Sequence, residues 1–182
     1  MPQLALHPEA KIIRVQLRQN FVLRHMTEAQ WQELEALLDI ADYPKGELLE
    51  HQGDCSMEQY FILDGILKRV VANAEGREMI LRFAAESDID TSYAAWRLKT
   101  PIPYSILAVT RVRAAKLSME DWVGFMERHP AVKSAFEFQV MKLMSEVMAH
   151  VITLHLLDAP SPRSSASSPG TRTPISPRGA AP

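Results

Sequence analysis

The sequence predicts an α+β fold in which a β-roll lies between helices. Between residues 40 and 117, short alternating apolar runs are cut by turn residues at roughly ten-residue intervals, which is typical of a mostly antiparallel sheet or barrel. From Val132 to Leu157, apolar residues instead recur at alternating spacings of four and three, the rhythm of a helix that pairs with another helix. A length of 182 residues with 47% hydrophobic content favours one domain with appendages.

The charge of the chain argues against non-specific binding to nucleic acid. The net charge is −2, but residues 159–182 hold three arginines and no acid, which leaves −5 on residues 1–158. With this negative charge, residues 1–158 would neutralise the phosphates of a nucleic acid poorly. The single cysteine, Cys55, excludes an intramolecular disulfide and a cysteine-only metal site, and we interpret it as an inert exposed thiol. Because no signal peptide or membrane-spanning run is recognisable, we expect a cytoplasmic protein.

The N-terminal segment, residues 1–26, is ambiguous, because residues 12–17 fit either a short strand or one face of a helix. A clearer helix begins at Thr27. Thr27 and Gln30 have the spacing of a capping box, and apolar residues follow at helical intervals. We expect this helix to end near Asp39.

Seven segments bounded by turn residues are predicted as strands. They are 40–43, 48–49, 60–63, 66–71, 79–83, 104–109 and 112–117, with an irregular segment at 84–103. Ser118 is expected to cap a short helix, and the long helix follows Pro130, because proline suits a first helical turn. We therefore divide the chain into an N-terminal segment (1–26), a roll (27–129), a long helix (130–158) and a proline- and serine-rich tail (159–182) that we expect to be disordered.

The stripe on the long helix predicts a dimer interface. Its members are Phe136, Val140, Leu143, Val147, His150, Leu154 and Leu157. Because a helix with such a seam usually buries it in a partner, we expect a homodimer with parallel long helices. His150, the polar member, is interpreted as a residue that sets the register. Metal or haem ligation is the weaker alternative, since His150 and His155 are five residues apart and do not share a helix face.

Several segments resemble the Crp/Fnr family of bacterial transcription regulators. They are 48–53 (LLEHQG), 60–65 (YFILDG) and 75–81 (EGREMIL), and the similarity continues through 114–118 to the end of the long helix at 154–158. The resemblance implies a cyclic-nucleotide-binding-like double-stranded β-helix followed by a dimerisation helix. It also implies a helix-turn-helix module after the hinge. The tail shows no such module, so we expect no direct DNA binding by this chain, and a frameshift is our hypothesis for the tail.

The resemblance also implies which residues would hold a cyclic nucleotide. Family members that bind one carry a Gly-Glu-Leu segment for the ribose and an Arg-Ser/Thr pair for the phosphate. By ungapped comparison the matching positions are 91–93 (Thr-Ser-Tyr) and 102–103 (Ile-Pro). Val147 and Met148, at the helix positions that would meet the base, offer no side-chain hydrogen bond. The effector is therefore predicted to differ from cyclic AMP.

Aromatic and hydroxyl residues near the same segment form the predicted ligand site. It comprises Thr91, Ser92, Tyr93, Tyr104, Ser105, Val147 and Met148. This lining would suit a small aromatic or uncharged effector, and the alternative is that the aromatic rings fill a collapsed pocket. Lys68-Arg69 and residues 111–113 are interpreted as solvated strand faces. No acid/base pair or activated nucleophile is recognisable, so we predict neither an enzyme nor a cofactor.

Two functions follow from these observations. The first is the sensor and dimerisation domain of a Crp/Fnr-type transcription regulator, with a small-molecule effector that is not cyclic AMP. The alternative is a protein-interaction module that forms homo- or heterodimers, with a vestigial pocket and no ligand.

Overall fold

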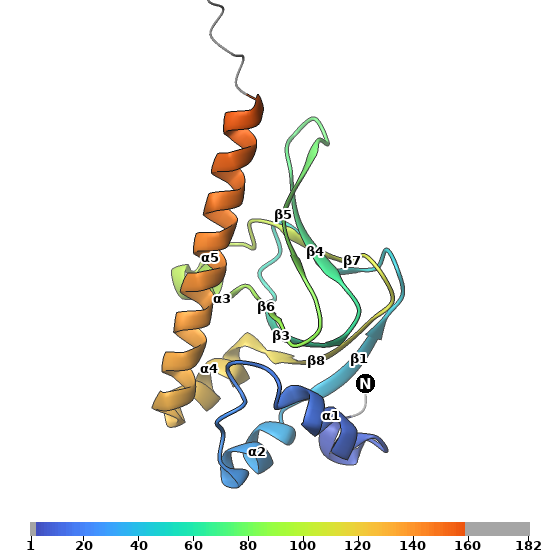
Figure 1. The fold of residues 1–182 in the computed structure, drawn as a ribbon, viewed down its shortest axis with the longest axis vertical. Helices are drawn as coiled ribbons and strands as arrows, with labels where there is room; N and C mark the ends of the chain where they lie inside the picture. The colour runs from blue at the N-terminus through green and yellow to red at the C-terminus, as the bar shows by residue number, and fades with distance from the viewer. Residues whose placement is uncertain (1–2, 159–182) are drawn as a thin grey trace, which may run out of the picture.

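The computed structural model describes residues 3–158, and for residues 155–158 it describes the backbone only. The tail at 159–182 and the side chain of Leu157 thus lie outside the described residues. Figure 1 shows a β-roll with short helices at one end and one long helix along its side. No helix in residues 3–158 combines the length and apolarity needed to span a bilayer.

The roll consists of two four-stranded antiparallel sheets, with the strand orders β1-β8-β3-β6 and β2-β7-β4-β5. The strands are β1 (Asp39–Tyr43), β2 (Leu48–Glu50), β3 (Glu58–Asp64), β4 (Leu67–Ala72), β5 (Glu78–Ala84), β6 (Ile89–Thr91), β7 (Ser105–Ala108) and β8 (Val112–Ser118). All seven predicted strands are confirmed, to within two residues at each end.

Strand β3 is buried on both faces and separates two apolar cores. Tyr60 and Ile62 belong to a core that the two sheets share. Phe61 and Leu63, which alternate with them, belong to a second core that includes the helices. In that second core Phe61 packs edge to face on Trp122, with 5.3 Å between the ring centroids. Because successive side chains of a strand point to opposite faces, a strand covered on both sides reads as a nearly continuous apolar run.

The ambiguous N-terminal segment is helical. A 3-10 turn, η1 (Leu4–Leu6), precedes helix α1 (Ala10–Leu17). Ile13 and Leu17 are both buried in the helical core. Their spacing of four residues places them on one helix face, which decides between the two alternatives.

Helix α2 (Glu28–Glu35) begins as predicted and ends early. The side chain and backbone of Thr27 and Gln30 bond reciprocally in a capping box. The prediction that the helix reaches Asp39 is wrong, because Asp39 already pairs with Lys116 at the start of β1.

The segment predicted as irregular contains strand β6 and helix α3 (Tyr93–Leu98). Helix α3 ends at Lys99, which adopts a left-handed conformation with φ of 55°. A strand of three residues and a helix of six are too short for hydrophobic periodicity to reveal them.

The two C-terminal helices begin at the predicted residues. Ser118 caps α4 (Met119–Arg128), because its Oγ accepts a hydrogen bond of 3.0 Å from the Asp121 N–H. Pro130 is the first residue of α5 (Pro130–Asp158), which has 29 residues.

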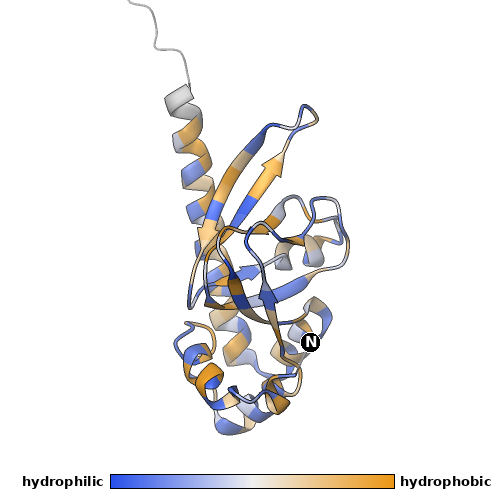
Figure 2. Cartoon of the chain, turned by 90° about the vertical axis from the view of Figure 1, so that its right-hand side faces the viewer, coloured by the Kyte–Doolittle hydropathy of each residue, from blue (hydrophilic) through white to orange (hydrophobic). Residues whose placement is uncertain are grey.

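The first half of α5 packs on the roll and helices of its own chain. Phe136 is fully buried, and its ring meets Trp122 and Tyr93 edge to face at 5.3 Å and 5.1 Å. Val140 and Leu143 are buried in the same core. The interface prediction is therefore wrong for Phe136, Val140 and Leu143, because a four-three stripe shows only that a helix packs on something. Figure 2 shows apolar residues recurring along the part of α5 that extends beyond the roll.

Candidate functional site

A buried ion pair crosses the interior of the roll. Arg69, from β4 in one sheet, bonds Asp90, from β6 in the other. Arg69 Nη2 and Nε both donate to Asp90 Oδ1, at 2.6 Å and 2.8 Å. The side chains are 10% and 1% exposed. Burial alone would lower the pKa of the Arg69 guanidinium, but the negative charge and hydrogen bonds of Asp90, together with Tyr104 and Glu50, outweigh burial and raise this pKa. The interpretation of Arg69 as part of a solvated strand face is wrong.

Tyr104 and Thr91 complete the surroundings of the guanidinium. Arg69 Nη2 donates a second hydrogen bond of 2.7 Å to the Thr91 carbonyl oxygen, and the guanidinium lies 4.3 Å from the centroid of the Tyr104 ring. The Tyr104 hydroxyl donates to the same carbonyl at 2.7 Å. These contacts from β4, β6 and the segment before β7 hold the guanidinium plane in one orientation.

A second buried carboxyl group lies next to this pair. Glu50, on β2, accepts a hydrogen bond of 2.6 Å from the Ser92 hydroxyl and one of 2.9 Å from the Glu58 N–H. Burial raises the pKa of Glu50 to about 7, although both hydrogen bonds lower it. Ser92 also lies 3.5 Å from the Tyr104 hydroxyl, so Glu50 is linked to the Arg69 cluster.

A small cavity of about 130 Å³ opens beside Arg69, between the roll and α5. Its lining residues are Arg69, Thr91, Ala94, Ala95, Pro103, Tyr104, Val140, Leu143 and Met144. The last three belong to α5, so the long helix forms one wall. Arg69 is the only charged side chain among these described lining residues. The cavity is therefore an apolar space with a single cationic group in its wall.

The structure brings together only part of the predicted ligand site. Thr91 and Tyr104 line the cavity. Ser92 bonds Glu50, as described above, and Ser105 accepts a hydrogen bond of 3.0 Å from the Gln52 N–H. Tyr93 packs in the helical core instead, and its hydroxyl donates to Glu137 Oε1 at 3.1 Å.

Val147 and Met148 do not reach this cavity. Val147 lines a different cleft of about 260 Å³, together with His150 and residues of β5. Met148 is 63% exposed. Both come after Met144, the last residue of α5 that lines the cavity.

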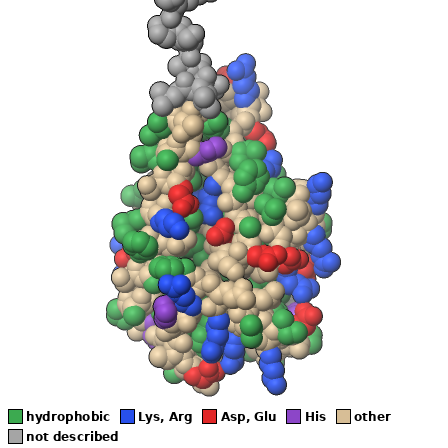
Figure 3. Space-filling view, in the orientation of Figure 1, with side chains coloured by type: hydrophobic (Ala, Val, Ile, Leu, Met, Phe, Trp, Pro, Cys, Tyr) green, Lys and Arg blue, Asp and Glu red, His purple; other side chains and the backbone are tan. Residues whose placement is uncertain are grey.

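From Phe138 to Ile152, α5 carries an exposed apolar stripe. Its members are Phe138, Met141, Met144, Met148 and Ile152, each at least 53% exposed. Their spacings of three and four residues place them on one side of the helix, turned away from the buried residues. Figure 3 shows hydrophobic side chains gathered along the edge that α5 forms. Met144 also lines the cavity, so it belongs to both features.

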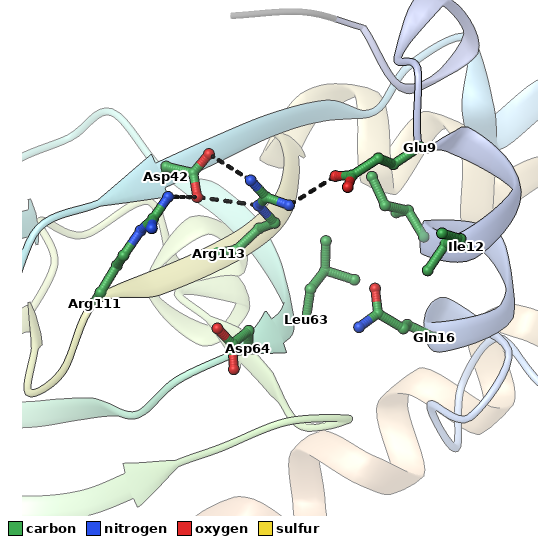
Figure 4. A pocket seen from close by; sticks show the side chains of 9 residues that line it. Glu9, Ile12, Gln16, Asp42, Leu63, Asp64, Arg111 and Arg113 are labelled. Carbon is green, nitrogen blue, oxygen red and sulfur yellow. Dashed lines mark hydrogen bonds and ion pairs between the residues drawn. The ribbon is translucent and has the colours of Figure 1, made fainter.

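A charged cleft of about 340 Å³ lies elsewhere, between α1 and the roll (Figure 4). Arg113 bonds Asp42 at 3.0 Å and Glu9 at 2.9 Å, and Arg111 reaches Asp42 at 3.4 Å. The nearby Arg113 guanidinium lowers the pKa of Asp42. Because these charges neutralise one another, the cleft offers no unshared cation, and we place the candidate site at the Arg69 cavity.

Comparison with known proteins identifies the family. Residues 40–129 match the model of the cyclic nucleotide-binding domain. Residues 40–129 belong to the cyclic nucleotide-binding domain family. No curated protein sequence matches it significantly.

Solved structures share the fold of this cyclic nucleotide-binding domain. Catabolite activator protein of Thermus thermophilus is 16% identical, with a TM-score of 0.61, over 74% of this chain and 62% of that one. The sensor domain of the transcriptional regulator DNR from Pseudomonas aeruginosa is 21% identical, with a TM-score of 0.64, over 79% and 94%. A regulatory subunit of a cAMP-independent protein kinase A from Trypanosoma cruzi, bound to guanosine, is 17% identical, with a TM-score of 0.60, over 79% and 50%. This chain thus spans about three fifths of the Thermus protein.

The interior of this domain differs from what a cyclic nucleotide would need. A cavity of about 130 Å³ is well below the roughly 300 to 1,000 Å³ of typical small-molecule sites. Ser92 stands where the sequence comparison places the ribose-binding glutamate, and its hydroxyl is already bonded to Glu50.

Proposed function

We propose that this chain is the sensor and dimerisation part of a Crp/Fnr-type transcription regulator whose effector is not cyclic AMP. One observation carries the proposal: α5 closes the cavity on one side and exposes an apolar stripe on another, and Met144 belongs to both. A ligand in the cavity would therefore touch the helix that meets the partner.

The proposed partner is a second copy of the chain, with the two α5 helices side by side. The stripe of Phe138, Met141, Met144, Met148 and Ile152 is left uncovered by the protomer, and such contiguous apolar surfaces mark interaction sites. In the first half of α5, the proposed interface therefore lies on a different face of the helix from the predicted residues Phe136, Val140 and Leu143. Val147, His150 and Leu154 remain candidates at the edge of the interface, since none of them is buried in the protomer.

Sensing would then act through the packing of α5. A ligand that binds better to one arrangement of the helix pair shifts the population toward that arrangement by the ratio of its affinities. In a longer regulator, the DNA-binding modules would follow this change. That output is part of the proposal and would require a further module.

Measurement of molar mass by light scattering tests the dimer. We expect a dimer for the unaltered chain, a monomer for Met148→Glu, and a dimer for the control Thr153→Glu, which introduces the same charge on an exposed position of α5 outside the stripe. A monomeric unaltered chain, or equal masses for the two variants, would contradict the proposed interface.

A ligand-dependent thermal shift tests the sensor. A ligand that binds, present at a hundred times its Kd, would add about 2.7 kcal/mol to the free energy of unfolding and so raise the melting temperature. Cyclic AMP should leave the melting temperature unchanged, because a cavity of about 130 Å³ is too small to hold it. The alternative function, a protein-interaction module without a ligand, is favoured by the small volume of the cavity. A dimer that binds no small molecule of any class would support that alternative.

A further inference from the structure

We propose that the cavity between the roll and α5 binds a short-chain carboxylate, such as butyrate, through Nη1 of Arg69. The inference rests on the proposed sensor function and names the effector class for the same cavity. Three observations carry it: the free Nη1 of Arg69, the size of the cavity and its apolar lining.

Arg69 has hydrogen-bonding capacity that the described residues do not use. Its Nε and Nη2 donate to Asp90 and to the Thr91 carbonyl, whereas Nη1 has no partner among residues 3–158. The side chain is nine-tenths buried and forms part of the cavity wall. A carboxylate oxygen is the acceptor that a guanidinium prefers.

The size of the cavity limits the ligand to a few heavy atoms. An apolar protein cavity of roughly 150 Å³ holds a molecule as large as benzene, so about 130 Å³ suits about four to six heavy atoms. Butyrate falls within this range, whereas a nucleotide does not.

The lining matches an anionic head with an apolar tail. Apart from Arg69, the lining includes the apolar residues Ala94 and Ala95 from α3 and Val140 and Leu143 from α5. An alkyl chain would bury its surface there, which is favourable at about 25 cal/mol per Å².

Three other titratable groups act electrostatically on the Arg69 guanidinium. Asp90 is bonded through the Nε and Nη2 side, Tyr104 lies against the plane, and Glu50 is linked through Ser92. Because Asp90 occupies one edge of the guanidinium, the Nη1 side stays available to an anion. Asp90 and ionised Glu50 weaken the attraction, so we expect a Kd on the order of 1 mM rather than tight binding.

Isothermal titration of the full chain with sodium butyrate tests the proposal, with butyramide as the uncharged analogue of the same shape. Butyrate should bind at least about tenfold more tightly, because the amide lacks the charge of the carboxylate. Affinity should fall for hexanoate, which exceeds the cavity. No binding of butyrate at about ten times the expected Kd, or equal binding of butyramide, would overturn the proposal.

Two variants locate the site. Ala94→Leu should fill the cavity and abolish binding, whereas Ala131→Leu, a matched change at an exposed position of α5, should not. Arg69→Lys keeps a cation for Asp90 but removes Nη1, and should also abolish binding if it folds. Unchanged affinity in Ala94→Leu, with the melting curve intact, would place the ligand elsewhere and overturn the proposal.

Molar mass measured on the same samples separates this inference from the proposed function. A dimer that binds no carboxylate contradicts the ligand class only. Butyrate binding that depends on Ala94 in a monomeric chain supports the ligand site and contradicts the dimer.

Discussion

Arg69 and Asp90 form an ion pair across the interior of the roll, with Nη2 and Oδ1 2.6 Å apart and both side chains almost excluded from solvent. The pair joins strands from different sheets, β4 and β6, which share no hydrogen-bonded edge. Two buried charges are stabilising together only because each compensates the other, so the loss of one leaves an uncompensated charge.

Replacement of Arg69 by methionine should therefore destabilise the chain strongly. We expect Arg69→Met to lower the free energy of unfolding by about 3 to 5 kcal/mol, because Asp90 is left as a buried charge without a partner. The neighbouring Lys68 is half-buried, and its Nζ lies 3.9 Å from a carboxylate oxygen of Glu78. Lys68→Met should cost no more than about 1 kcal/mol. Urea denaturation measures both, and similar losses would contradict the assigned role of the pair.

Glu50 should make the stability of the chain depend on pH near neutrality. Its pKa of about 7 in the folded chain lies above the value of about 4.3 expected when unfolded. Between these two values the folded chain holds a proton that the unfolded chain has released. Stability is therefore highest below about pH 4 with respect to this group, and it falls as the pH rises through 7.

Glu50→Gln should remove this dependence. The amide can retain hydrogen bonds to Ser92 and to the Glu58 N–H without a charge, so at pH 8 the variant should be more stable than the unaltered chain by up to about 3 kcal/mol. The exposed Glu47→Gln is the control and should follow the unaltered curve. Parallel curves of unfolding free energy against pH for all three proteins would show that Glu50 does not titrate there.

Two phenylalanines of α5 should behave oppositely. Phe136 is fully buried and Phe138 is 56% exposed. Phe136→Ala should lower the melting temperature sharply, at a cost of about 3 to 5 kcal/mol, because it leaves a cavity between α4 and α5. Phe138→Ala should change the stability of the protomer by less than about 1 kcal/mol. Calorimetry of both variants checks the prediction, which fails if Phe138→Ala is the more damaging.

Gly65 occupies a turn where no side chain fits. Its φ is +89°, and a Cβ atom would lie 2.2 Å from the Arg111 carbonyl oxygen. Gly53 has a φ of +99° with no atom within 4 Å of such a Cβ. Gly53→Ala should thus cost only the backbone strain of about 1 to 2 kcal/mol. Gly65→Ala should cost at least about 2 kcal/mol more, and equal chemical denaturation midpoints would contradict this.

The elements of the fold were largely predictable because their signals are local. Thr27, Ser118 and Pro130 mark helix starts through the chemistry of a single turn. Strand boundaries follow from turn residues and from alternation of apolar side chains. The surface that a helix packs against depends on the whole chain. The four-three spacing predicted from Phe136 to Leu157 therefore could not show whether these residues meet a partner helix or the roll.

The candidate site was less predictable, because its residues come from three separate strands, one loop and two helices. Glu50, Arg69 and Asp90 were all missed. A signal for Arg69 did exist: it stands two residues after the buried Leu67 in the same strand, and that period places both on one face. The neighbouring Lys68 suggested a solvated basic pair, whereas strand alternation sends the two cations to opposite sides.

Strand β5 is one of the two outermost strands of its sheet, and α5 contacts it. An outer strand presents unpaired backbone donors and acceptors, to which a strand from another molecule can add. Ile80 and Phe83 on β5 are 37% and 55% exposed, which would favour such an addition. Val147 and His150, in the far half of α5, line a cleft together with residues of β5, so this half of the helix lies against the strand. We expect a chain shortened near Met144 to keep its buried core contacts, to leave β5 uncovered and to add strands from other molecules more readily.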